Sequence, residues 1–175
     1  MKRIISAVLA SGCLLIISAQ NGFAVPIDPV EEDQRCPVCG MFVAQYEQWL
    51  AQIIITSRDP LVFDGVKDMM AYYFNPAGYG EAADMETAEI WVRNYYTLDY
   101  INARAAYYVV GSDVMGPMGD ELIPFSSLEE AENFKTDHHG KEILRFAEID
   151  ARQIMEMKQK HMMKMKKMKA IKKQN

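Results

Sequence analysis

Apolar residues along the chain fall into short runs separated by turn formers, a pattern that predicts alternating strands and helices. Residues 49–55 are rich in strand formers, and a short apolar run at 61–63 follows the turn sequence SRDP. Asp64 is placed to cap a helix over residues 65–74, which the Asn-Pro pair at 75–76 ends. The first half therefore predicts a β-β-α unit.

The second half follows a similar order of elements without repeating the sequence. An acidic, glycine-containing loop over residues 77–87 is expected to separate the halves. The sequence Ser126-Ser127-Leu128-Glu129 has the form of a capping box and opens a helix that ends before Gly140. Strands are expected at residues 90–97, 105–110, 122–125 and 142–146, with a glycine-punctuated loop over 111–119. The expected fold class is α+β, built from two β-β-α-type units.

Charge divides the chain into an acidic body and a basic end. All 24 acidic residues fall within residues 28–156, which hold nine lysines and arginines, whereas residues 158–173 hold eight lysines and no acid. We expect one domain over residues 25–150 and a helical, Lys/Met-rich extension over residues 151–175. The acidic body argues against nucleic-acid binding.

The extension allows two interpretations. It is a solvated helix whose lysines keep the protein soluble, or it collects copper through soft donors. Its lysines would also draw the chain toward anionic lipid or an acidic partner. The soft donors of the second interpretation are His161, Met162, Met163, Met165 and Met168.

Residues 1–24 have the form of a secretory signal peptide. The positive start MKR precedes an apolar run up to Ala19, and GFA at residues 22–24 resembles a cleavage site. We expect cleavage after Ala24 and a periplasmic protein. Because the sequence around Cys13 loosely resembles a lipobox, a lipid anchor at Cys13 is the alternative. The apolar run is too short and too interrupted for a transmembrane helix.

Sulfur side chains gather in two turn-rich motifs. Cys36 and Cys39 form a Cys-x-x-Cys pair within CPVCGM, which ends at Met41, and Met118 lies in the sequence GPMG. Two thiols and a thioether within six residues suit a soft ion such as Cu(I). The glycine between Cys39 and Met41 allows both to face one ion. A methionine in a turn is more exposed than one in a core, which favours Met118 as a ligand from the second half.

Three other interpretations of the cysteine pair compete with a soft-metal site. A structural disulfide is the simplest one in an oxidising compartment. A redox pair would make the chain a thiol-disulfide oxidoreductase acting through Cys36 and Cys39, although its acidic lead-in is unlike a thioredoxin-type context. Zinc usually needs four Cys or His ligands, and the sequence offers no second cysteine pair. Because the sequence shows no set of nucleophile, base and orienting group, an enzyme is not expected.

The motifs, taken in order, resemble those of the NosL family, the accessory proteins of nitrous oxide reductase. The resemblance covers roughly residues 34–146 and rests on CPVCGMFV at 36–43, FDG at 63–65, GPMG at 116–119, IPF at 123–125 and the stretch 134–140. It implies a periplasmic Cu(I) chaperone, commonly lipid-anchored, with a fold similar to that of organomercurial lyase. It does not cover the Lys/Met-rich extension.

The resemblance also implies ligands and partners. Cys39, Met41 and Met118 match the family's copper ligands, Cys36 matches its cysteine motif, and His138 or His139 matches its His-Gly position. A lone histidine at a helix end more often acts as a capping cation, so both histidines are secondary candidates. The implied cargo is Cu(I), and the implied client is apo nitrous oxide reductase with its copper-sulfur centre. Other maturation proteins and copper donors are further expected partners.

Overall fold

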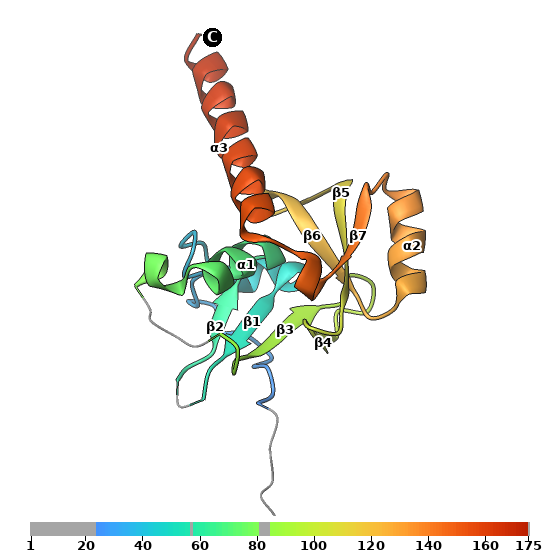
Figure 1. The fold of residues 1–175 in the computed structure, drawn as a ribbon. Helices are drawn as coiled ribbons and strands as arrows, with labels where there is room; N and C mark the ends of the chain where they lie inside the picture. Colours follow the sequence, from blue (N-terminus) through green and yellow to red (C-terminus); the bar gives the residue numbers. More distant parts are fainter. Residues whose placement is uncertain (1–23, 57, 81–84, 175) are drawn as a thin grey trace, which may run out of the picture.

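Two antiparallel sheets, each accompanied by a helix, form the body of the protein, and a long helix follows at its end (Figure 1). The computed structural model describes residues 24–56, 58–80 and 85–174; the expected leader up to residue 23, with Cys13, lies outside them. The elements are η1 Val43–Trp49, β1 Ala51–Ile54, β2 Leu61–Phe63, α1 Val66–Phe74, η2 Pro76–Tyr79, β3 Glu89–Arg93, β4 Tyr100–Asn102, β5 Tyr107–Gly116, β6 Gly119–Phe125, α2 Leu128–Asp137, β7 Glu142–Arg145, η3 Phe146–Glu148 and α3 Ala151–Gln174.

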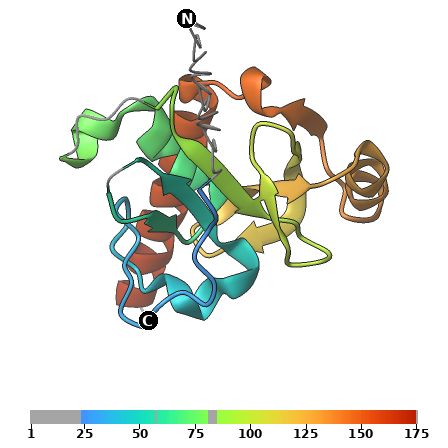
Figure 2. The same ribbon diagram turned by 90° about the horizontal axis from the view of Figure 1, so that it is seen from below.

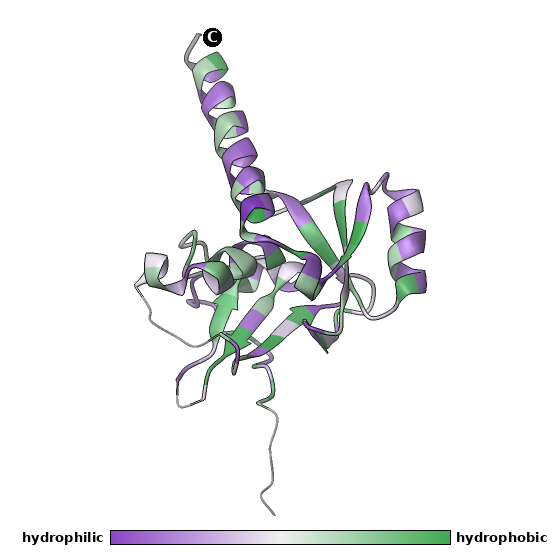
Figure 3. Cartoon of the chain, viewed as in Figure 1, coloured by the Kyte–Doolittle hydropathy of each residue, from purple (hydrophilic) through white to green (hydrophobic). Residues whose placement is uncertain are grey.

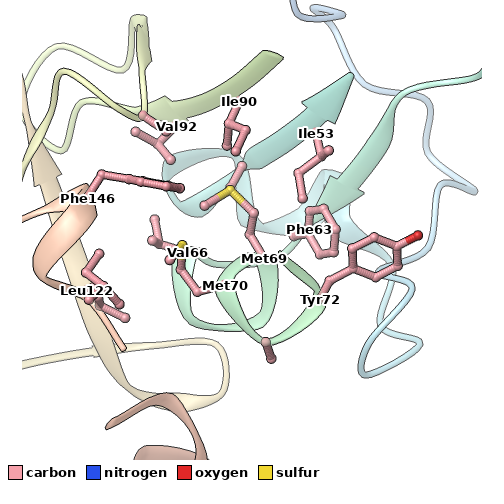
Figure 4. Packing of buried hydrophobic residues seen from close by; sticks show 14 of the residues in the cluster. Ile53, Phe63, Val66, Met69, Met70, Tyr72, Ile90, Val92, Leu122 and Phe146 are labelled. Carbon is pink, nitrogen blue, oxygen red and sulfur yellow. The ribbon is translucent and has the colours of Figure 1, made fainter. Parts of the chain in front are cut away.

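The first sheet has the strand order β2-β1-β3-β4 and packs against α1. Every residue of β1 is buried, and so are seven of the nine residues of α1. Figure 4 shows Met69 pointing from α1 toward Ile90 of the sheet, while Leu122 of β6 belongs to the same buried cluster. Because the core continues from the first sheet to β6, α1 is held between the two halves of the molecule.

The second sheet has the order β6-β5-β7 and packs against α2. The side chain of Ser127 accepts a hydrogen bond from the backbone of Glu130, whose carboxylate in turn caps the backbone of Ser127. The expected capping box is thus present one residue later than the sequence suggested. Figures 1 and 2 place α2 at the side of this sheet that lies away from the first sheet.

The expected boundary over residues 77–87 is wrong. β3, which was expected to begin the second half, pairs with β1 in the first sheet, with Ala51 opposite Val92. The segments β1-β2-α1 and β5-β6-α2 do follow the expected order of two strands and a helix. Apolar alternation indicates which segments are strands but does not select the partner of each strand, since that depends on burial in the assembled core.

The loop expected over residues 111–119 is also wrong, because β5 runs on to Gly116 and forms a hairpin with β6. Gly116 pairs with Gly119, so Pro117 and Met118 occupy the turn. Proline favours the second position of such a turn, and Gly119 adopts the positive φ of 85° that glycine accommodates at low cost. The glycines that suggested a loop instead mark an irregular register and a tight turn.

The Lys/Met-rich extension forms α3, as expected. Its first half docks on the body, where Ile154 is 2% exposed, and Met157 packs against the same core. From Met162 to Lys172 every residue is exposed, and the helix projects away from the sheets (Figure 1). Along that projecting half, polar and apolar residues alternate without a wide apolar face (Figure 3). None of the helices in the described ranges has the length and apolarity that crossing a membrane requires.

Candidate metal centre

The Cys-x-x-Cys motif folds into a tight loop ahead of η1. The N–H of Cys36 donates to the carbonyl of Met41, and the N–H of Gly40 donates to the carbonyl of Cys36, both at 2.9 Å. Gly40 has a φ of 77°, the left-handed conformation that closes this loop. Cys36 is therefore directed into the core, where it is 1% exposed, and Cys39 remains half-buried. Both cysteines are free thiols in the structure.

Two carboxylates face the cysteines from the start of α1. The thiol of Cys39 donates to Oδ1 of Asp64 at 3.3 Å, and the Sγ of Cys36 lies 3.9 Å from Oδ2 of Asp68. The four candidate ligand atoms all lie within 4.8 Å of one another. The expectation that Asp64 caps α1 is wrong, because Gly65 occupies the N-cap position. Oδ2 of Asp64 is instead buried without a hydrogen-bond partner. A bound cation would satisfy this orphaned oxygen.

Burial keeps the cluster from carrying its full negative charge. A hydrogen bond with Cys36 and burial raise the pKa of the Cys39 thiol well above its ordinary value. Burial and the nearby Asp64 raise the pKa of Asp68. Cys39 therefore keeps its thiol proton in the apo protein, and an ion that binds this sulfur must replace that proton.

Met118 shares a cavity with this cluster. The cavity has a volume of about 310 Å³. It is lined by Val38, Cys39, Lys67, Asp68, Met118, Lys158, His161 and Met162. The fold thus brings the turn of the β5-β6 hairpin to the cysteine loop, although the two sulfur motifs lie far apart in the sequence.

Buried Lys67 positions the Met118 turn. Its Nζ donates to the carbonyl of Met118 at 2.5 Å and to the carbonyl of Asp120 at 2.7 Å. One carboxylate oxygen of Glu121 accepts from the backbone N–H of Lys67 and from that of Leu122. Burial raises the pKa of Glu121 to about 8, although the charge of Lys67 opposes this. One lysine therefore connects α1 to both residues that flank Gly119.

Four of the expected ligands lie outside the cavity wall. Cys36 is buried in the core next to Cys39 and does not line the cavity. Met41 is half-buried, and its backbone N–H is hydrogen-bonded to the sulfur of Cys39. His138 ends α2, where its Nδ1 lies 3.2 Å from the carboxylate of Asp113 and its ring stacks on Phe134. His139 follows with a positive φ of 55°. Cys39 and Met118 thus line the same cavity, Cys36 lies next to Cys39 in the buried cluster, and the two histidines lie beside the second sheet.

Several residues of the site were not anticipated. Asp64 and Asp68 lie four positions apart around the expected start of a helix, which marks them in the sequence as neighbours, although Asp64 itself precedes the cap of α1. No comparable signal marks Lys67 or Glu121, because their roles depend on tertiary contacts between α1 and β6.

The donor set determines which ions suit the site. Two thiols and a thioether favour a soft ion such as Cu(I). Two thiols and two carboxylates also provide four ligand atoms, the number that tetrahedral zinc requires. The positive charges of Lys67 and Lys158 on the cavity wall are opposed by the carboxylates of Asp64 and Asp68, so charge alone does not select the ion. The thioether of Met118 is the donor that favours a soft ion over zinc.

The same geometry disfavours thiol-disulfide exchange. A reactive cysteine has a lowered pKa, usually at a helix N-terminus or beside a cation. Here the pKa of Cys39 is raised, and the helical element that follows the motif begins only at Val43. The burial of Cys36 and the raised pKa of Cys39 both disfavour attack on a disulfide.

Fold and site define an α+β protein with a sulfur-lined cavity between a cysteine loop and a hairpin turn. The chain belongs to the NosL family, since the model of that family matches residues 26–154. A curated relative, the copper-binding lipoprotein NosL of Stutzerimonas stutzeri, is 28% identical over 129 residues, which cover 71% of this chain and 67% of that protein.

Two solved structures are similar. The crystal structure of the copper chaperone NosL from Shewanella denitrificans matches with a TM-score of 0.61 at 24% identity, covering 71% of this chain and 95% of that chain. This likeness shows the shared fold. The solution structure of apo-NosL from Achromobacter cycloclastes is 34% identical, with a TM-score of 0.42, and covers 57% of this chain and 83% of that chain.

Proposed function

We propose that this protein is a periplasmic Cu(I) carrier that delivers copper for the copper-sulfur centre of nitrous oxide reductase. The observation that carries the proposal is the shared cavity, which Cys39 and Met118 both line although they come from different halves of the chain. The curated relative is a copper-binding lipoprotein, and one structural relative is a copper chaperone. The reductase as client rests on membership of the NosL family.

The proposed ligands are the thiolates of Cys39 and Cys36 and the thioether of Met118. Thiolates bind Cu(I) strongly and a thioether binds it more weakly, so the set combines tight holding with one exchangeable bond. Cys39 is half-buried and Met118 lies in a hairpin turn, which gives a partner's ligands access to the ion. Met41, whose backbone N–H contacts the Cys39 sulfur, positions that thiolate in this scheme. His138 and His139 have no part in it.

The carboxylates of Asp64 and Asp68 would not bind Cu(I) strongly, because hard oxygen donors suit hard cations. They add negative charge beside the thiolates and so oppose the positive charges of Lys67 and Lys158. The domain organisation that accompanies the proposal is a removed leader over residues 1–24, a copper-binding body over 25–150 and a basic extension over 151–175.

A competition titration tests the proposal. The reduced mature protein is titrated anaerobically with Cu(I) against a chromophoric Cu(I) chelator. Because each substitution removes a sulfur donor, Cys39→Ser and Met118→Leu should each weaken Cu(I) binding at least about tenfold, equivalent to ~1.4 kcal/mol. Met115→Leu is the matched control, since Met115 lies in the same hairpin but is 45% exposed and outside the cavity wall.

The same variants, together with Asp64→Asn and Asp68→Asn, are titrated with Zn²⁺ to separate the two kinds of ion. Selective loss of Cu(I) binding in Met118→Leu supports a thioether-containing Cu(I) site. Wild-type Cu(I) affinity in Cys39→Ser would disprove the site, and tight Zn²⁺ binding that depends on Asp64 and Asp68 would replace the copper proposal with a zinc one.

A further inference from the structure

The helix α3 contributes side chains to the cavity that the proposed ligand set does not use. Lys158, His161 and Met162 all line the cavity that contains Cys39 and Met118. His161 is half-buried, whereas Met162 is 54% exposed, so the pair reaches from the cavity wall to solvent. An imidazole and a thioether are both accepted ligands of Cu(I).

The docking of α3 brings these donors to the Met118 turn. Lys160 forms an ion pair with Asp120, which follows the turn. Nδ1 of His161 lies 2.7 Å from the point where a side chain at Gly119 would begin, so the imidazole packs directly on the residue after Met118. One turn earlier in α3, Nζ of Lys158 donates to the hydroxyl of Tyr79 in η2 at 3.0 Å. Contacts with η2 and with the β5-β6 hairpin turn therefore hold the part of α3 that carries His161.

Helical spacing continues this line of donors outward. Ile154, Lys158 and His161 are the docked positions, and the same spacing of four and three residues leads next to Met165 and then Met168. Met165 is 40% exposed and Met168 is 56% exposed. The face that docks at the cavity therefore continues outward with the exposed thioethers of Met165 and Met168. The helix projects from the body along this outer part (Figure 1).

We propose that His161 and Met162 form an entry site for Cu(I) at the cavity, from which the ion passes to Met118 and the thiolates. The inference rests on the proposed function, because it concerns the same cavity. Passage is ligand exchange without any change of oxidation state. As each Cu–S bond to Cys36 or Cys39 forms, the thiol proton leaves to solvent and a bond to the imidazole or to a thioether of α3 breaks.

Nuclear magnetic resonance with ¹³C-methyl-labelled methionine tests the entry site on the reduced mature protein. Substoichiometric Cu(I) should shift the methyl signals of Met162 and Met118, whereas Met155, which is 60% exposed and outside this cavity, should not shift. Stopped-flow mixing with the Cu(I)–chelator complex then measures the rate of Cu(I) uptake by two double variants. His161→Ala combined with Met162→Leu should take up Cu(I) at least about tenfold more slowly than wild type. The control, His139→Ala combined with Met155→Leu, should keep the wild-type rate.

The outcomes separate this inference from the proposed function. If wild type and the α3 pair take up copper equally fast and the Met162 methyl does not shift, while Cys39→Ser still loses affinity, the entry site is wrong and the carrier proposal holds. If wild type does not bind Cu(I), both fail. The single variant Met162→Leu preserves size and helix propensity, so a slowed uptake there confirms that the thioether, and not the packing of α3, is responsible.

Discussion

At the scale of single residues, Lys67 and Glu121 hold together two segments that lie more than 50 positions apart. Neither side chain is a proposed ligand, yet Lys67 bonds the carbonyl of Met118, and Glu121 bonds the backbone of α1. Buried polar groups of this kind are retained only when they are paired, because an unpaired one costs free energy. The position of the Met118 thioether thus depends on residues that never contact the ion.

Lys67→Met should lower both stability and copper affinity. It leaves the carbonyls of Met118 and Asp120 without their donor and Glu121 without its neighbouring cation, so the free energy of unfolding should fall by roughly 2 kcal/mol. Urea unfolding measures this loss, and the chelator competition measures the weakened binding. Lys141→Met, at an exposed position, is the control. Equal stabilities of the two variants would show that the buried bonds contribute nothing net.

Glu121 should make stability depend on pH in a defined direction. Burial raises its pKa to about 8, so between the ordinary carboxyl range and that value the folded state holds a proton that the unfolded state has lost. The free energy of unfolding therefore falls as pH rises through this window. Glu121→Gln, which carries no titrating group, should flatten the dependence measured by urea unfolding between about pH 5 and about pH 8. Exposed Glu132→Gln should keep the wild-type slope.

At the scale of elements, local sequence signals succeeded where short-range geometry decides the outcome. The helix expected over residues 65–74 is α1, and the helix opened by the serine pair is α2. The length of β5 escaped prediction because its outer part, rich in glycine and polar residues, becomes a strand only by pairing with β6. Strand formation depends on a partner, and glycine alone does not reveal whether one is present.

Ser127→Ala should destabilise α2 and the second sheet beneath it. The substitution removes the side-chain oxygen that accepts from the backbone of Glu130, a cap worth about 1 kcal/mol. Thermal unfolding followed by circular dichroism measures the loss. Ser112→Ala, within β5, is the matched control because no cap is lost there. A Tm shift no larger than that of the control would contradict the role of the capping box.

At the scale of the whole molecule, the candidate site could be predicted only in part. The local motifs named the sulfur donors, and family resemblance linked Cys39 to Met118, but pattern alone gives no reason for the two to meet. Their approach requires α1 to lie between the cysteine loop and the hairpin turn, with Asp64 and Asp68 on one side and Lys67 on the other. Such contacts depend on the assembled core, which local periodicity does not specify.

The two halves of α3 should differ sharply in their effect on stability. Ile154→Ala creates a cavity where α3 docks and should cost roughly 2–4 kcal/mol in urea unfolding. A chain that ends after Met163 loses a segment in which every residue from Lys164 to Lys172 is exposed, and it should keep the wild-type free energy of unfolding. If the shortened chain were destabilised as much as Ile154→Ala, the outer half of the helix would have to make contacts with the body.

The projecting, lysine-rich half of α3 also makes the molecule an electric dipole, with positive charge at the tip of the helix and negative charge spread over the body. A dipole of this kind turns in the field of an acidic surface before contact, so the helix tip arrives first. Such steering acts over distances near the Debye length and weakens as ionic strength rises. Encounters with an acidic partner should therefore be fast in dilute buffer and slow in concentrated salt. They should also be oriented so that Met165 and Met168 of α3 meet the partner before the cavity does.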